Sequence, residues 1–132
     1  MSCQGIWVGF DEATKANGCL WGVPGSHQQP PKHYMKVKTD QATGRRSTFM
    51  DPPTPSFDYS TDGAVPLETA PGSIVLIHGS FLHFSEKNVS SEKQRHAYTL
   101  HIVESQGVKY SDANWIQRPA HLPFRPVSKE GI

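Results

Sequence analysis

The chain has 132 residues, enough for one domain, with 36 % hydrophobic and 19 % charged residues and a formal net charge of +1. It contains no run of like charge and no stretch of about 20 apolar residues, so we expect no binding to nucleic acid or to a membrane. Cys3 and Cys19 have no Cys-x-x-Cys spacing and the first residues lack a signal-peptide pattern, which predicts a reduced, cytoplasmic setting.

The first elements in chain order are two short strands joined by a turn. Residues 5–10 are apolar and rich in strand-forming types, and residues 19–23 follow the same pattern. Between them, Asn17 and Gly18 form a dipeptide that is typical of tight turns. We therefore interpret residues 5–23 as a strand–turn–strand unit.

The next stretch, residues 28–71, is rich in proline and weakly patterned. Its only alternating segment is 34–38, which indicates a strand. The rest, from Thr39 to Pro71, is interpreted as a long loop or insertion. Loops of this length are typically functional lids or flexible insertions, and both interpretations stay open.

The clearest strand covers residues 72–78, which are β-branched and apolar on both faces and are expected to be buried on both. It continues through residues 81–84. After a polar connector, residues 95–103 alternate as a strand with two distinct faces. Since no amphipathic helix is evident, the sequence predicts an all-β sandwich or small barrel.

Two candidate functional residues lie at the ends of these strands. His83 follows the buried strand, where its imidazole could bind a metal ion or could belong to an exposed loop. Arg95 opens the last strand, where its guanidinium could bind a carboxylate or could pair with Glu92 at the surface. We expect both side chains at the same end of one sheet.

Two further residues are candidates for the same site. Ser85 lies two residues after His83 and so points to the same face of an extended chain, although it could also be a turn serine. Trp21 lies in the second strand, where its indole could line a pocket or pack in the core.

Three segments together resemble the phytanoyl-CoA dioxygenase family. They are the run from Asn17 to His27 (NGCLWGVPGSH), the run from Gly72 to Ser85 (GSIVLIHGSFLHFS), and the run from Arg95 to His101 (RHAYTLH). The tail from Asn114 to Phe124 resembles the end of one subgroup of that family. The resemblance extends from about Ile6 to Phe124 and is poor only in the middle loop.

The resemblance implies a double-stranded β-helix (a jelly roll, or cupin-like fold) and an Fe(II)- and 2-oxoglutarate-dependent dioxygenase that hydroxylates a small-molecule substrate. His83 would be the distal iron ligand. Arg95 would bind the far carboxylate of 2-oxoglutarate with help from Ser85, and Trp21 would line the same pocket. The co-substrate would be converted to succinate and CO₂.

The chain departs from the family pattern in its metal ligands. The family's other two ligands come from a His-x-Asp pair, and no His-x-Asp or His-x-Glu occurs in this sequence. We therefore interpret residues 1–132 as the C-terminal portion of a dioxygenase domain, incomplete at its N-terminal side. An alternative is a non-catalytic jelly-roll module that binds a small acid or a protein partner. A third hypothesis is a cupin-like metal site that adds His78 or His101 to His83.

Overall fold

The computed structural model of the chain describes residues 3–53 and 63–127. Almost all regular structure in these residues is β, with two short 3₁₀ turns, η1 (Lys15–Asn17) and η2 (Ser26–Gln28). No helix in the described part is long and apolar enough to cross a membrane. The chain forms two compact units, one from residues 1–32 and 55–109 and the other from residues 33–54 and 110–132.

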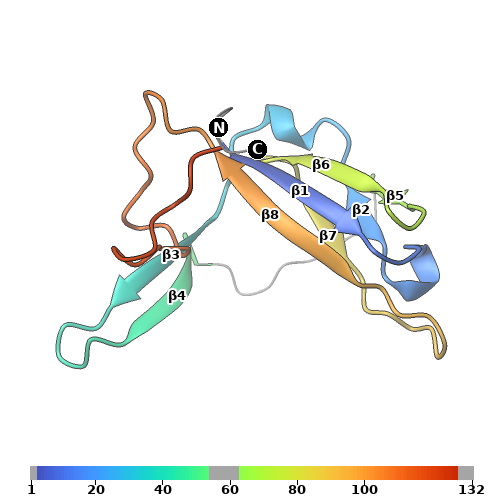
Figure 1. Ribbon diagram of the computed structural model, residues 1–132, viewed down its shortest axis with the longest axis horizontal. Coiled ribbons are helices and arrows are strands. Elements are labelled where there is room, and N and C mark those ends of the chain that lie inside the picture. Colours follow the sequence, from blue (N-terminus) through green and yellow to red (C-terminus); the bar gives the residue numbers. More distant parts are fainter. Residues whose placement is uncertain (1–2, 54–62, 128–132) are drawn as a thin grey trace. The chain divides into compact units, whose positions relative to one another are not determined.

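The first unit contains a three-stranded antiparallel sheet in the order β6-β1-β8. Its central strand β1 (Cys3–Gly9) lies between β6 (Ile74–His78) and β8 (Ala97–Val103), as Figure 1 shows. The register sets Trp7 opposite Val75 on one side and Thr99 on the other. Since directly opposite residues share a face, these three side chains lie on one face of the sheet.

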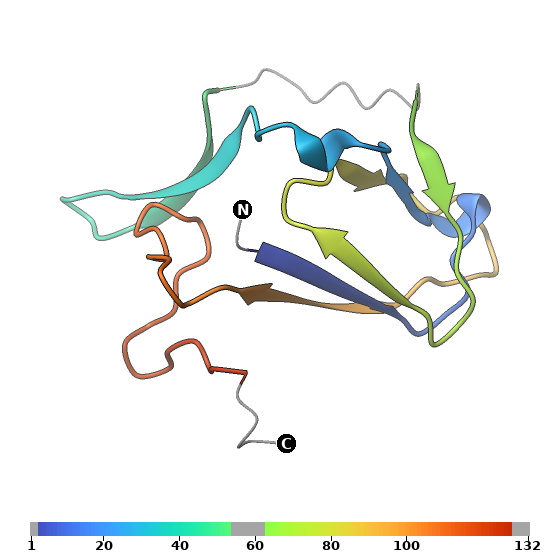
Figure 2. The same ribbon diagram turned by 90° about the horizontal axis from the view of Figure 1, so that it is seen from above.

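A second antiparallel sheet in the same unit has the order β5-β2-β7. It is built from β2 (Leu20–Gly22) between β5 (Val65–Leu67) and β7 (His83–Ser85), and it lies above the first sheet in the view of Figure 2. The buried core contains residues of both sheets and of the segment between them: Trp7, Ala13, Cys19, Leu20 and Ile77. The expected all-β architecture of two packed sheets is therefore confirmed.

The expected strand–turn–strand unit is present, but its two strands do not pair with each other. β1 and β2 lie in different sheets, so the chain crosses from one sheet to the other between them. The crossing uses η1 and then Gly18, which adopts a left-handed conformation with φ 85°. The turn that Asn17 and Gly18 signal in the sequence thus ends a 3₁₀ turn and does not close a hairpin.

The outer face of the β6-β1-β8 sheet is apolar and uncovered by the described residues. The register places Leu76, Ile6 and Leu100 in one row across the strands and Ile74, Val8 and Tyr98 in the next. Leu76 is 72 % exposed and Ile74 is 62 % exposed. The prediction that residues 72–78 are buried on both faces is therefore wrong: only Val75 and Ile77 of β6 face the core.

The second unit contains a hairpin of β3 (Tyr34–Thr39) and β4 (Arg46–Asp51). Its turn is held by Asp40, whose carboxylate accepts hydrogen bonds from the backbone N–H groups of Ala42 and Thr43. The strand expected at residues 34–38 is confirmed. The long loop expected from Thr39 to Pro71 is wrong at β4 and β5, while residues 54–62 of that range lie outside the described residues.

The start of β8 is fixed to the end of β1 by an acid–histidine contact. One carboxylate oxygen of Asp11 accepts from the backbone N–H of His96 at 2.7 Å and lies 2.8 Å from the Nδ1 atom of the same residue. The backbone hydrogen bond, followed by the contact with the ring, holds the pKa of Asp11 below its usual range. A carboxyl group with a lowered pKa stabilises the fold above its unfolded pKa, and this stabilisation disappears as the pH falls through the folded value.

Replacing Asp11 with Asn is expected to lower the melting temperature at pH 7. The difference from wild type should shrink as the pH falls below about 4, where the unfolded carboxyl group binds a proton while the folded one still resists protonation. Thermal unfolding followed by circular dichroism from pH 3 to pH 8 would measure it. The matched control is Glu12→Gln, which removes an exposed ion pair with Lys93 and should change little at any pH. An equal loss of stability by Asp11→Asn at pH 3 and pH 7 would contradict the assignment.

Candidate functional site

The guanidinium of Arg95 is held in place by two neutral acceptors. Its Nε donates to the carbonyl oxygen of Gly18 at 3.0 Å, and one Nη donates to the Ser85 hydroxyl at 3.1 Å. Within the described residues it forms no ion pair, so the surface pairing with Glu92 left open by the sequence is not formed. A half-buried cation with a fixed orientation and no anionic neighbour is suited to bind an anion from solution.

Ser85 completes this arrangement. Its hydroxyl donates to the Gly18 carbonyl at 3.0 Å while it accepts from Arg95. Ser85 ends β7 in one sheet, whereas Arg95 leads into β8 in the other. The expectation that one sheet would carry the whole site is therefore wrong: the contact between Ser85 and Arg95 joins the two sheets.

His83 has one ring nitrogen engaged by the backbone. Its Nδ1 lies 2.9 Å from the carbonyl oxygen of Phe81, and because a carbonyl can only accept, Nδ1 carries the proton. The Nε2 lone pair is then left for a metal ion or a proton donor. The Phe81 ring stacks on the imidazole at 6.4 Å, and Gly22 leaves space for that ring, since a Cβ there would lie 2.3 Å from it.

Trp21 does not share a face with His83 and Ser85. Its cross-strand neighbour is Phe84, and the two rings stack with centroids 6.1 Å apart, so both lie on the opposite face of β7. The structure therefore does not bring Trp21 to the Arg95 site. Its indole Nε1 is buried and has no hydrogen-bond partner among the described residues.

Trp7 is the tryptophan that faces the interior between the two sheets. It is 4 % exposed, and its ring lies over Gly9, where an added Cβ would come within 2.9 Å of it. The sequence pattern did not single out Trp7, because a short apolar run shows no inner face. The glycines at positions 5 and 9, which alternate with Trp7, are the signal that could have identified it.

The described residues contain no group of three His, Cys, Asp or Glu side chains that could hold a metal ion. The third hypothesis, a site of three imidazoles, is not supported by this arrangement. His78 contacts the His27 ring edge-on at 5.5 Å, and His101 lies opposite Gly5 in the first sheet. Within the described residues, His83 therefore belongs to no such group.

The model of the family described as phytanoyl-CoA dioxygenase (PhyH) matches residues 1–97. The chain belongs to this family. It is 40 % identical to "Phytanoyl-CoA dioxygenase 1" of Oryza sativa subsp. japonica, covering 96 % of this chain and 41 % of the relative. It is 39 % identical to the Caenorhabditis elegans homolog of phytanoyl-CoA dioxygenase domain-containing protein 1, covering 96 % and 43 %. The chain thus spans about two fifths of the length of these relatives.

A solved structure supports the same fold for this chain. EvdO2 from Micromonospora carbonacea var. aurantiaca, which was solved in complex with 2-oxoglutarate, superposes with a TM-score of 0.53. The two are 29 % identical, and the match covers 75 % of this chain and 37 % of that one. The predicted jelly-roll class and the family resemblance are therefore confirmed.

Gly18 is the residue at this site that tolerates substitution least. Its left-handed φ strains any other residue, and an added Cβ would also lie 2.8 Å from the carbonyl oxygen of Glu86. Gly18→Ala should therefore lower the free energy of unfolding by about 1–2 kcal/mol through backbone strain. Overlap of the new Cβ with the Glu86 carbonyl oxygen should lower it by a further amount of about 1–3 kcal/mol. Chemical denaturation would measure both.

Gly72→Ala is the matched control, because Gly72 has a similar φ of 79° and open space around it. Gly72→Ala should lower the free energy of unfolding only by the contribution from backbone strain. Equal losses in the two variants would show that the close approach of Gly18 to Glu86 has no energetic consequence.

Proposed function

We propose that the chain forms the co-substrate-binding part of an Fe(II)- and 2-oxoglutarate-dependent dioxygenase domain that acts on a small-molecule substrate. The observation that carries the proposal is the Arg95 guanidinium, fixed by Gly18 and Ser85 and without an anionic partner in the described residues. Membership of the phytanoyl-CoA dioxygenase family and the similarity to a protein solved with 2-oxoglutarate support it.

The spacing of the residues suits a short dicarboxylate. His83 and Ser85 lie on one face of β7, two residues apart, which corresponds to roughly 7 Å along an extended strand. Arg95 would bind the distal carboxylate, Ser85 would assist by holding the guanidinium in place, and the 2-oxo acid end would point toward His83. Arg95 would neutralise the carboxylate charge and orient the acid, because the guanidinium presents its remaining N–H groups on one edge.

The residues present do not by themselves suit an iron site. A facial site for Fe(II) uses two histidines and one carboxylate, and the described residues contain no such group around His83. When bound, iron would supply the oxidative chemistry. The remaining ligands would have to come from residues other than those described around His83; the chain spans about two fifths of the length of its relatives. The role of this chain is then to present the His83 Nε2 and to hold the acid.

Anaerobic titration of the 132-residue chain with 2-oxoglutarate, with and without Fe(II), tests the proposal. Calorimetry should detect binding of the acid, and Arg95→Ala should weaken it at least tenfold, since a charge-assisted bidentate contact is lost. His83→Ala should retain this metal-independent binding. Cooperative unfolding of each variant is the control for folding.

The visible charge-transfer band of an iron and 2-oxoglutarate complex separates two functions. A band that depends on His83 would mean that this chain assembles a metal centre with other ligands. Binding of the acid without a band would favour the alternative of a non-catalytic module that binds a small acid, which the absence of a His-x-Asp pair supports. If the folded chain binds no dicarboxylate, the proposal is wrong.

The positions of Trp7 and Trp21 give an independent prediction. Because Trp7 is buried in the interior and Trp21 lies on the face opposite to that of His83 and Ser85, 2-oxoglutarate should change the fluorescence of Trp7. Trp7→Phe should abolish the signal, and Trp21→Phe should leave it intact. The reverse result would restore Trp21 as the pocket residue implied by the family resemblance.

A further inference from the structure

We propose that Asn17 is the positioning residue that fixes the direction of the Arg95 guanidinium and so sets the affinity for the dicarboxylate. This inference rests on the proposed function, because it concerns the same arginine. Asn17 itself touches no part of the acid-binding edge. It acts through two backbone carbonyl groups. One belongs to Gln94, which directly precedes Arg95, and the other belongs to Gly18, which accepts the hydrogen bond from the Arg95 Nε.

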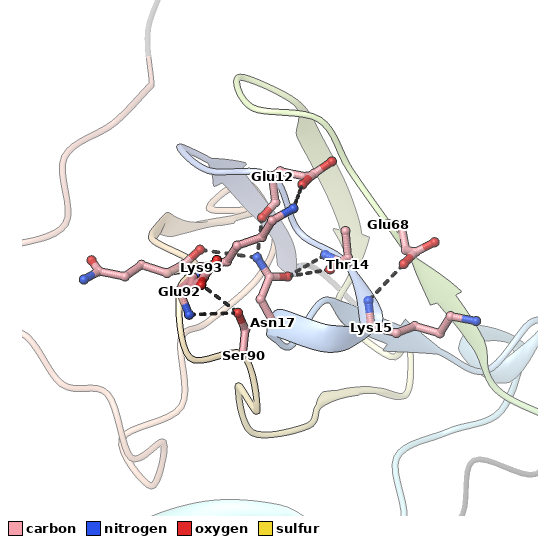
Figure 3. A network of polar contacts seen from close by, with 9 residues as sticks. Glu12, Thr14, Lys15, Asn17, Glu68, Ser90, Glu92 and Lys93 are labelled. Atoms are coloured by element: carbon pink, nitrogen blue, oxygen red, sulfur yellow. Dashed lines mark hydrogen bonds and ion pairs between the residues drawn. The ribbon is translucent and has the colours of Figure 1, made fainter.

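Asn17 is a buried amide with every hydrogen-bonding position occupied. Its side chain is 1 % exposed, and Oδ1 accepts from the backbone N–H and the hydroxyl of Thr14 at 2.6 and 3.1 Å. Its Nδ2 donates to the carbonyl oxygens of Glu12 at 2.8 Å and Gln94 at 3.3 Å. Figure 3 shows the amide at the centre of this network. A fully satisfied buried amide holds one orientation, since any rotation leaves polar groups unpaired.

These bonds fix both ends of the arginine. Gln94 directly precedes Arg95, so its contact with Asn17 holds the backbone from which the arginine side chain starts. Gly18 directly follows Asn17, and its carbonyl receives the Arg95 Nε. The same amide therefore fixes the origin of the side chain and the acceptor that sets the plane of its guanidinium.

The connector between β7 and β8 depends on the same turn. Its first residue, Glu86, places its carbonyl against Gly18, and Val89 donates from its backbone to Ala16 at 3.2 Å. Together with Gln94 near its far end, the connector is hydrogen-bonded to the turn at two points and lies close against it at a third. Hydrogen bonds thus hold the guanidinium close to the Asn17 turn, although Arg95 and Asn17 lie 78 residues apart in the sequence.

Asn17→Asp isolates the donor half of this network. A carboxylate still accepts from Thr14, but it has no N–H for Glu12 and Gln94, whose carbonyl oxygens it would face with a negative charge. We expect about tenfold weaker binding of 2-oxoglutarate by calorimetry. In ¹⁵N-resolved NMR spectra, the Arg95 Nε–H signal should lose its protection from solvent exchange.

Thr14→Ala is the matched control. It removes one hydrogen bond to the same Asn17 oxygen but leaves both Nδ2 bonds and Arg95 untouched. It should lose stability and keep the affinity for 2-oxoglutarate and the Arg95 Nε–H signal. A role of Asn17 in folding alone predicts that Asn17→Asp, measured at a temperature where it is folded, has wild-type affinity and a wild-type Arg95 signal. That result would overturn the proposal.

If Asn17→Asp does not fold, the wild-type chain provides the test. Saturating 2-oxoglutarate should slow the exchange of the Arg95 Nε–H and the Asn17 Nδ2 hydrogens together. Slower exchange at Arg95 with no change at Asn17 would overturn the coupling. If the wild type binds no 2-oxoglutarate, and the Arg95 signal still depends on Asn17, the proposed function fails and the positioning role alone stands.

Discussion

The carbonyl oxygen of Gly18 is the single acceptor on which the candidate site depends. It receives the Arg95 Nε and the Ser85 hydroxyl, and so joins a strand end of one sheet to the entry of a strand in the other. The oxygen can be there only because the backbone of Gly18 is left-handed and lies against Glu86 with no side chain between them. The side-chain amide of Asn17, the residue before Gly18, then stabilises this geometry because its oxygen and its nitrogen are both hydrogen-bonded inside the protein.

The placement of the polar candidate residues could be predicted from the sequence because each lies next to a strongly patterned strand. His83, Ser85 and Arg95 lie at strand ends, and two of them meet as expected, with His83 on the same face of β7 as Ser85. Trp21 was placed wrongly relative to them because a three-residue strand carries no visible alternation. Its face is decided by the cross-strand pairing with Phe84, which is a property of the fold.

The strands followed the hydrophobic pattern wherever that pattern was strong. β1, β6 and β8 were found within a few residues of their ends. β4 was not predicted because its side chains are mostly exposed and show no apolar alternation. β5 was not predicted because it has only three residues and contains Pro66. The outer face of β6 was misjudged for another reason: β-branched residues fit a pleated strand whether or not anything covers them, so composition alone does not report burial.

The dipeptide of Asn17 and Gly18 also has a chemical consequence. Asparagine followed by glycine is the pair most prone to deamidation, in which the glycine nitrogen attacks the side-chain amide and ammonia leaves. That attack requires the amide to rotate out of a network that occupies both of its polar atoms. The intact fold therefore protects the turn at Asn17 and Gly18 from deamidation. Each opening of the turn exposes the amide of Asn17 to conversion into a carboxylic acid, which raises the mass of the chain by about one unit. The rate at which deamidated protein accumulates during storage would report how often the chain unfolds locally at this turn.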